Sequence, residues 1–228
     1  MNSYRDRWEQ FWCKEKFPPL VSYEEASKSK MYGGTKIEPS ASIGMSYFLS
    51  PIQDLFDEGF SIIDYGCGAG ILSNFISSRL KHFNYVGLEP NNQHGNERLS
   101  IAKSLINDSR IRFGYIDDIS DYEENFDCIV MISVFTHLTI EKIYSILDDL
   151  RPKIKNGSKL IFSCFISDRY ELLIPQPSIA KNFYGVSKIT IDQLNKYVDD
   201  NELKIEKCDD FVAQGGYVHS IFKIEAKQ

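Results

Sequence analysis

The sequence lacks a cysteine framework. Its five cysteines are widely spaced and form no C-x-x-C pair, a usage typical of a reducing compartment rather than of a disulfide-stabilised secreted protein. It also lacks a run of about eighteen apolar residues, the length that a membrane-spanning helix needs. The charged N-terminus contains no apolar segment typical of a signal peptide. We therefore expect a cytoplasmic protein without a membrane partner.

Basic residues are also scarce. Lys and Arg number 26 against 32 Asp and Glu, the formal net charge is −6, and no basic run occurs. Proteins that bind nucleic acid usually carry a basic surface that displaces phosphate counterions. We therefore expect no nucleic-acid partner. The 228 residues are 43% hydrophobic, which is enough for one sizeable core.

Internal repeats are absent, and from Ser61 onward short β-branched runs alternate with amphipathic stretches of helical length. Apolar strands separated by helices are typical of a parallel sheet with helices on both faces. The predicted strands are 61–65, 84–89, 111–115, 126–132 and 158–166, and the predicted helices are 70–80, 91–107, 117–123 and 138–155. We expect the last of these helices to stop at Asn156-Gly157.

The pattern changes after the fifth predicted strand. A loop that carries Pro175 and Pro177 leads to a predicted helix over 190–200, with Thr190 as its N-cap. The final strands, 203–208 and 217–226, are joined by a short turn and should pair antiparallel.

Residues 1–60 stand outside this alternation, and we expect two parts: a helical N-terminal extension over 1–60 and an α/β domain over 61–228. Trp8, Phe11 and Trp12 fall on one face of a predicted helix. That helix either packs against the core or forms a lid over the site.

Glycines concentrate in the segment Asp64-Tyr65-Gly66-Cys67-Gly68-Ala69-Gly70, directly after the first predicted strand. Ligands of open α/β sheets bind at the carboxyl ends of the strands, and glycines allow the backbone to approach a ligand closely. A dinucleotide fingerprint would need a glycine where this sequence has Ile71. Asp64 is unfavourable for a pyrophosphate and suits a ligand that carries cationic groups, so a nicotinamide-dependent oxidoreductase is disfavoured.

This segment resembles the first motif, (D/E)-x-G-x-G-x-G, of the class I S-adenosylmethionine-dependent methyltransferases. The resemblance covers roughly residues 60–166. It implies an α/β, Rossmann-like sheet of seven mostly parallel strands, with an antiparallel last strand and helices on both faces. It also implies that Asp64, Gly66, Gly68 and Gly70 bind the methionine end of the cofactor, S-adenosyl-L-methionine. The alternative is that the loop is only a tight turn between a strand and a helix.

Further residues fit the same family pattern. Glu89 ends the strand in "YVGLEP", and the resemblance implies that its carboxylate accepts both ribose hydroxyls of the cofactor. Asp117, in "RFGYIDDI", aligns with the acid that accepts the adenine amino group, and Asp118 is expected to offer its backbone. Ser133, after the fourth strand, is also expected in the cofactor site. The alternative for each acid is a helix cap.

His137, in "VFTHL", follows the fourth predicted strand and has an ordinary pKa of about 6.5, which suits a proton acceptor near neutral pH. Members of the family that methylate small oxygen nucleophiles often carry a histidine near this place. We therefore predict that His137 is the general base. The alternative is that it caps the next helix or shapes the pocket.

Several groups of methyltransferases carry motifs that this sequence lacks, and these absences narrow the class of substrate that the resemblance implies. The segment Ile132-Ser133-Val134-Phe135 lacks the polar-Pro-Pro-aromatic motif of amino-methylating nucleic-acid enzymes and the acid that holds magnesium in catechol-type enzymes. No cysteine has the Pro-Cys or Thr-Cys context of cytosine-5 enzymes. These absences favour a metal-independent enzyme that methylates an oxygen of a small molecule. A similarity around "SVFTHL" favours a sugar or a phosphorylated precursor of surface glycans, in polysaccharide biosynthesis. A non-catalytic, cofactor-binding subunit is the alternative.

Overall fold

The computed structural model describes residues 31–32, 35–36, 52, 55–68, 70–122, 126–173, 186–212 and 218–227. The chain divides into two compact units, which we call the N-terminal unit, Cys13–Glu124, and the C-terminal unit, which contains Asn125–Gln228. The helix expected around Trp8 lies outside the described residues. Within the predicted helical extension, the strands β1 (Met31–Tyr32) and β2 (Thr35–Lys36) form an antiparallel pair.

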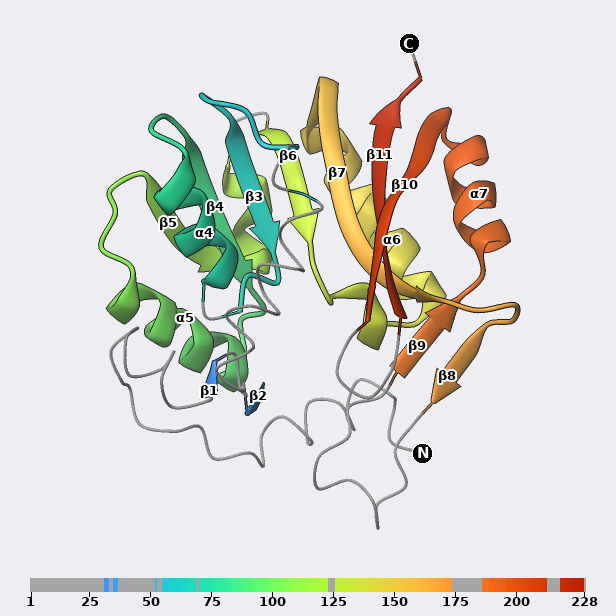
Figure 1. The fold of residues 1–228 in the computed structure, drawn as a ribbon, viewed down its shortest axis with the longest axis horizontal. Coiled ribbons are helices and arrows are strands. Elements are labelled where there is room, and N and C mark those ends of the chain that lie inside the picture. Colours follow the sequence, from blue (N-terminus) through green and yellow to red (C-terminus); the bar gives the residue numbers. More distant parts are fainter. Residues whose placement is uncertain are drawn as a thin grey trace. The chain divides into compact units, whose positions relative to one another are not determined.

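The N-terminal unit contains three parallel strands in the order β3-β4-β5, which run side by side in Figure 1. They are β3 (Ser61–Tyr65), β4 (Asn84–Glu89) and β5 (Ile111–Tyr115), joined by α4 (Ile71–Arg79) and α5 (Gln93–Leu105). The bounds of all three strands match the predicted ranges. The helix predicted over 117–123 is instead a 3-10 helix, η1 (Ile116–Asp121).

The core of this unit explains its alternation of strands and helices. Side chains that point to both faces of β3 and β4 are buried, among them Ile62, Ile63, Val86 and Leu88. Strands buried on both faces need helices on both sides. Apolar side chains of α4 and α5, which pack against each other, supply the cover on one face: Leu72, Ile76, Leu99 and Ala102. No helix among the described residues is long and apolar enough to cross a membrane.

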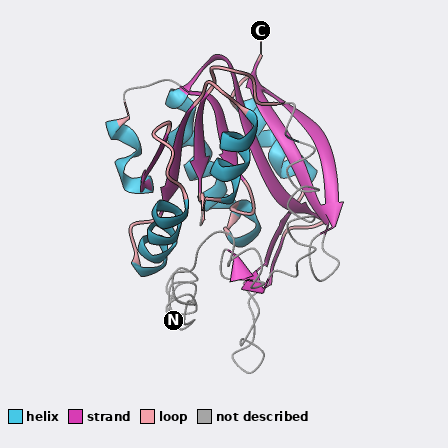
Figure 2. Cartoon of the chain, turned by 60° about the vertical axis from the view of Figure 1, so that its left-hand side comes forward, coloured by secondary structure: helices cyan, strands magenta, loops and turns pink. Residues whose placement is uncertain are grey.

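The C-terminal unit has the strand order β10-β11-β7-β6. Its strands are β6 (Phe126–Met131), β7 (Ile154–Ile166), β10 (Leu203–Val212) and β11 (Val218–Ala226), and its helices, cyan in Figure 2, are α6 (Ile140–Leu150) and α7 (Ile191–Asp200). The strands β6 and β7 are parallel, whereas β11 pairs antiparallel with both β7 and β10. The predicted antiparallel pair at the end of the chain is therefore confirmed.

The ends of the two helices test two predictions. Thr190 is the N-cap of α7, as the sequence predicts, and the structure adds a capping box with Gln193. The prediction that α6 continues to residue 155 is wrong. The helix ends at Leu150, and Pro152 follows in a 3-10 turn, since proline has no N–H to extend the helix.

Gly157 was expected to stop that helix, but it lies inside β7 instead. Its φ of 85° is in the left-handed region. The pairing of β6 with β7 shifts register between Phe126 and Cys128, whose partners are Ile154 and Lys159. The glycine therefore accommodates an irregularity of the strand pair rather than a helix end.

A strand pair that the sequence did not reveal lies after β7. The strands β8 (Glu171–Leu173) and β9 (Val186–Ile189) pair antiparallel, and β9 also pairs parallel with β7. Glu171 bridges to Arg169 and Lys188, each at 2.9 Å. Strands of this length carry too few residues for a recognisable alternation, so the sequence indicated only a loop. Pro175 and Pro177 lie outside the described residues.

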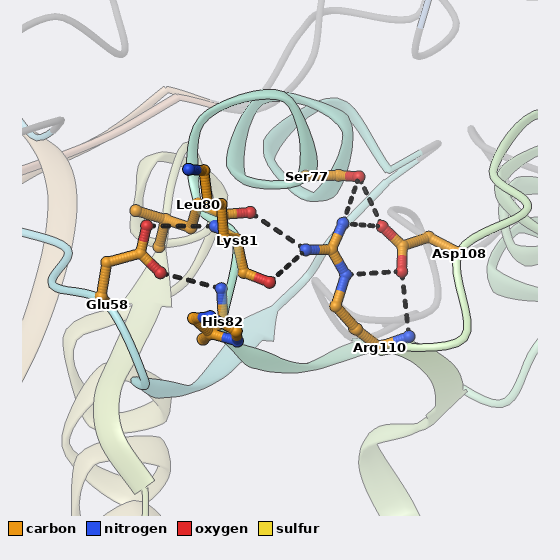
Figure 3. A network of polar contacts seen from close by, with 7 residues as sticks. All are labelled: Glu58, Ser77, Leu80, Lys81, His82, Asp108 and Arg110. Atoms are coloured by element: carbon orange, nitrogen blue, oxygen red, sulfur yellow. Dashed lines mark hydrogen bonds and ion pairs between the residues drawn. The ribbon is translucent and has the colours of Figure 1, made fainter.

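Loops at the amino ends of β4 and β5 are tied together by charged side chains (Figure 3). Arg110, directly before β5, donates through Nε and Nη2 to the carboxylate of Asp108 at 2.9 and 2.5 Å. Its Nη1 donates to the carbonyl oxygens of Leu80 and Lys81 at 3.0 and 2.8 Å, just before β4. The hydrogen bonds from Arg110 hold the pKa of Asp108 well below its usual range.

Glu58 extends this network to the chain before β3 (Figure 3). Its carboxylate accepts from the backbone N–H groups of Lys81 and His82 at 3.1 and 2.8 Å. These two backbone hydrogen bonds lower the pKa of Glu58. The side chains of Glu58, Asp108 and Arg110 therefore fix the starts of the three parallel strands relative to one another.

We expect Asp108→Asn to lower the midpoint of thermal unfolding by a few degrees at neutral pH, because a neutral amide makes weaker bonds to Arg110. Because folding lowers the pKa of Asp108, its contribution is present above the ordinary carboxyl pKa of about 4 and is lost in stronger acid. The difference between variant and wild type, followed by circular dichroism, should therefore shrink on acidification. Asp149→Asn, at an exposed position of α6, is the control, and an equal effect of both substitutions would contradict the prediction.

Candidate functional site

The loop between β3 and α4 turns back over the end of β4. The N–H groups of Gly66 and Cys67 both donate to the carbonyl oxygen of Leu88, at 2.8 and 3.0 Å. The φ angles of Gly66, Gly68 and Gly70 are 82°, 58° and 82°. All three glycines thus adopt the left-handed region, which side chains other than glycine rarely enter. The backbone path of the loop accounts for the alternate glycines.

Gly68 and Gly70 differ in what surrounds them. A Cβ atom on Gly70 would lie 2.6 Å from Cδ1 of Ile106 and 3.3 Å from Cβ of Ala102, so this glycine lets the start of α4 pack closely against the end of α5. A Cβ atom on Gly68 would meet no atom of the described residues within 4 Å. The open space at Gly68 marks it as the glycine of the pair that a ligand can approach.

Asp64 is buried beneath this loop, with 4% of its surface exposed. Its Oδ2 accepts a hydrogen bond from the Tyr85 hydroxyl of β4. The pKa of Asp64 is raised to about 7, chiefly by burial; the Tyr85 hydroxyl opposes the rise and the charge of Glu89 adds to it. A cationic group beside Asp64 would favour its ionised form.

Glu89, the last residue of β4, is also buried, with 3% of its surface exposed. Its Oε1 accepts from the Gly68 N–H at 2.5 Å, and its Oε2 lies 3.8 Å from Nη1 of Arg98. Burial raises the pKa of Glu89, and both Arg98 and the Gly68 N–H counteract that rise. The N-cap of the following helix α5 is Asn92, so Glu89 is not its cap.

Gly87 of β4 leaves room for side chains of neighbouring elements. This glycine lies opposite both Asp64 and Phe113 in the strand register. A Cβ atom here would lie 2.8 Å from the Phe113 ring and 3.0 Å from Sγ of Cys67. The thiol and the ring therefore fill the room that a side chain would take. Burial raises the pKa of Cys67, which keeps it a neutral packing group.

Asp117 and Asp118 lie in the first turn of η1, which follows β5. Asp117 is exposed and Asp118 is half-buried. The N-cap of η1 is Tyr115, so neither acid serves as the cap that was the alternative reading. Both acids thus follow the carboxyl end of the strand that pairs with β4.

Ser133 and His137 belong to the C-terminal unit. Ser133, just after β6, has a φ of 58°, and its N–H donates to Oγ of Ser163 at 2.8 Å. Its carbonyl oxygen accepts from the Thr136 hydroxyl at 2.8 Å. His137 is the last residue of the 3-10 helix η2, Phe135–His137, in which the buried Phe135 packs against Phe162 of β7. The roles of Ser133 and His137 stay predictions from the sequence.

The structure thus brings Asp64, Gly68 and Glu89 together and adds Tyr85 and Arg98, which sequence reasoning missed. Strand alternation places Tyr85 and Glu89 on one face of β4, which was a usable signal for Tyr85. Arg98 had no such signal, since it reaches the site from the middle of a helix. Within the described ranges, no group of three or more His, Cys, Asp or Glu side chains is placed to hold a metal ion.

Gly95 is a further residue that sequence reasoning missed. Its N–H donates to the N-cap side chain of Asn92 at 2.9 Å. A Cβ atom on Gly95 would lie 1.8 Å from the carbonyl oxygen of Pro90 and 3.4 Å from Cβ of Glu89. The absence of a side chain at Gly95 therefore lets the first turn of α5 rest directly on the end of β4.

Comparisons with known proteins show the family of this chain. Residues 40–207 match a family model described as "Methyltransferase domain". The sequence is 27% identical over 153 residues to malonyl-[acyl-carrier protein] O-methyltransferase 2 of Ilyobacter polytropus, covering 63% of this chain and 55% of that protein. The chain thus spans about half the length of the curated relative that it matches.

Solved structures give the same fold. A SAM-dependent methyltransferase of Methanosarcina mazei has a TM-score of 0.60 at 17% identity, over 78% of this chain and 97% of that chain. The magnesium protoporphyrin IX methyltransferase of Synechocystis PCC 6803, solved with bound SAM, has a TM-score of 0.58 at 16% identity, over 97% of this chain and 91% of that chain. These likenesses confirm the predicted fold class.

We expect Gly95→Ala to destabilise the protein by about 1–3 kcal/mol, because overpacking forces α5 away from the Pro90 carbonyl. In a helix without such a contact, the same change would stabilise by about 1 kcal/mol. Urea denaturation therefore shows directly whether the substitution lowers or raises the free energy of unfolding. Ser100→Ala, at an exposed position of α5, is the control and should change the free energy of unfolding little. A Gly95→Ala protein at least as stable as the wild type would show that the contact with Pro90 does not constrain the helix.

Proposed function

We propose, from the premise that the chain belongs to the methyltransferase-domain family, that it transfers a methyl group from S-adenosyl-L-methionine to an oxygen atom of a small molecule, without a metal ion. The observation that carries this proposal is the buried arrangement of Asp64 and Glu89 around the open space at Gly68. When bound, the cofactor supplies a methyl group that its sulfonium already activates.

The residues of the N-terminal unit fit this cofactor chemically. The ammonium and sulfonium groups are cations, and Asp64 is an acid whose ionised form a cation would favour. The ribose hydroxyls are donors, and the carboxylate of Glu89 keeps acceptor capacity beyond its bond to the Gly68 N–H. Asp117 and the backbone of Asp118 would bind the adenine.

The acceptor atom is proposed as oxygen on two grounds. The Ilyobacter relative is named for O-methylation of malonyl-[acyl-carrier protein]. The sequence "SVFTHL", which contains Ser133 and His137, favours a hydroxyl of a sugar or of a phosphorylated glycan precursor. These acceptors need different help from the protein: a carboxylate is already ionised at neutral pH, whereas a hydroxyl attacks well only as it loses its proton. We assign to His137 the role of the base that accepts this proton.

A non-catalytic, cofactor-binding subunit is the main alternative. Such a subunit would bind S-adenosylhomocysteine but release none from S-adenosylmethionine with any acceptor. A screen that measures S-adenosylhomocysteine release with sugar hydroxyls, sugar phosphates and malonyl thioesters therefore tests the activity itself. Stabilisation by NAD but not by S-adenosylhomocysteine in a thermal-shift assay would instead favour an oxidoreductase.

We expect Glu89→Ala to weaken binding of S-adenosylhomocysteine by about 1.5–3 kcal/mol, the usual effect of losing a charged hydrogen-bond partner. Isothermal titration calorimetry measures this loss, which is about tenfold to about a hundredfold in Kd. Asp149→Ala, at an exposed acid of the C-terminal unit, is the matched control and should bind as the wild type does. Unchanged affinity in a folded Glu89→Ala protein would remove Glu89 from the site.

We expect His137→Ala to lower turnover with a hydroxyl acceptor by about a hundredfold or more, the usual contribution of a positioned base. Affinity for the cofactor should hardly change. The wild-type rate should rise with pH through one ionisation near neutral, and the variant should lose that step. With a carboxylate acceptor, both proteins should turn over alike. Normal turnover of the variant on saturating hydroxyl acceptor would end the assignment of His137 as the base.

A further inference from the structure

Arg98 brings a positive charge to the buried carboxylates. It lies on α5, and its side chain is 19% exposed, against 4% for the side chain of Glu89. Its Nη1 is 3.8 Å from Oε2 of Glu89, whereas the other oxygen of that carboxylate accepts from the Gly68 N–H. Gly95, one turn earlier, lets the helix approach β4 closely enough for this contact.

The groups around Glu89 are mostly acidic. Asp64 of β3 and the thiol of Cys67 in the glycine loop both interact electrostatically with it, and Tyr85 of β4 bonds to Asp64. Two carboxylates buried together repel each other, so at least one tends to hold a proton. Among the described residues, Arg98 is the cation that lies against this group, and guanidinium stays charged at any pH that a protein tolerates.

We propose that Arg98 is a positioning residue that keeps Glu89 ionised, so that both of its oxygens can accept the ribose hydroxyls of the cofactor. This proposal rests on the proposed function. A protonated carboxyl would turn one oxygen into a donor and so lose acceptor capacity toward two hydroxyl donors. The separation of 3.8 Å exceeds hydrogen-bond length, so Arg98 acts through its charge and leaves the lone pairs of Oε2 open.

The first test compares the binding of S-adenosylhomocysteine by Arg98→Met, Arg98→Lys and wild type, using calorimetry at about pH 6 and at about pH 8.5. We expect Arg98→Met to bind more weakly than the wild type at the lower pH, by up to the roughly tenfold that one unit of Glu89 pKa allows, and nearly as well at the higher pH. Arg98→Lys keeps the charge and should keep the wild-type profile. Lys103→Met, at an exposed position of the same helix, is the control for loss of a positive charge alone.

A double-mutant cycle separates this role from packing. In a Glu89→Gln background the side chain at position 89 cannot ionise, so Arg98→Met should weaken binding no further. A purely structural Arg98 would weaken binding equally in both backgrounds and at both pH values, which would overturn the proposal. The same holds if Arg98→Met binds with the wild-type profile.

A second measurement needs no cofactor. Carbon-detected NMR of the free protein should report a pKa of Glu89 that is higher in Arg98→Met than in wild type by about one unit. If Arg98→Met does not fold, the comparison with Arg98→Gln takes its place. Unchanged titration of Glu89 would overturn the proposal. Failure of the wild type to bind S-adenosylhomocysteine would instead overturn the proposed function, and the NMR titration would still decide the role of Arg98.

Discussion

The hydrogen bond from the Gly68 N–H to the carboxylate of Glu89 is the contact around which the N-terminal unit is organised. It joins the loop after β3 to the last residue of β4, and it forms only because that loop runs through left-handed glycines. Gly95 brings α5 to the same strand end and Gly70 packs α4 against α5. The positions of two helices and of two buried carboxylates thus depend on a few side chains being absent.

The two edges of the three parallel strands handle negative charge in opposite ways. At the amino edge, Asp108 and Glu58 are matched with donors that lower the pKa of each acid. At the carboxyl edge, burial dominates and raises the pKa of both Asp64 and Glu89. One edge therefore contributes stability, whereas the other keeps acidic groups that a cationic, hydroxyl-bearing ligand would satisfy. Burying acids without full compensation is typical of sites that bind or react rather than of structural ones.

Elements with a strong local sequence pattern could be predicted from the sequence. Short β-branched runs that alternate with stretches of helical length gave β3, β4 and β5 to the residue, and Thr190 marked the start of α7. Sequence reasoning missed features that depend on contacts distant in sequence: the pairing of β9 with β7, the strand at Gly157, and the approach of Arg98 to Glu89. A helix stop and a strand irregularity both favour glycine, so only the register of β6 against β7 distinguishes them. The family and the fold class are confirmed, and the roles of the individual residues stay predictions.

The strand β10 ends the order of described strands in the C-terminal unit and pairs with β11 alone among them. An exposed edge of this kind is a template on which another chain can add a strand and start an aggregate. Charged side chains along β10 oppose such an addition: Lys204, Glu206, Lys207, Asp209 and Asp210. The register also shifts between Lys207 and Asp209, which interrupts the regular row of backbone groups. The charges and the register shift of β10 would therefore disfavour the addition of a strand from another copy of the chain.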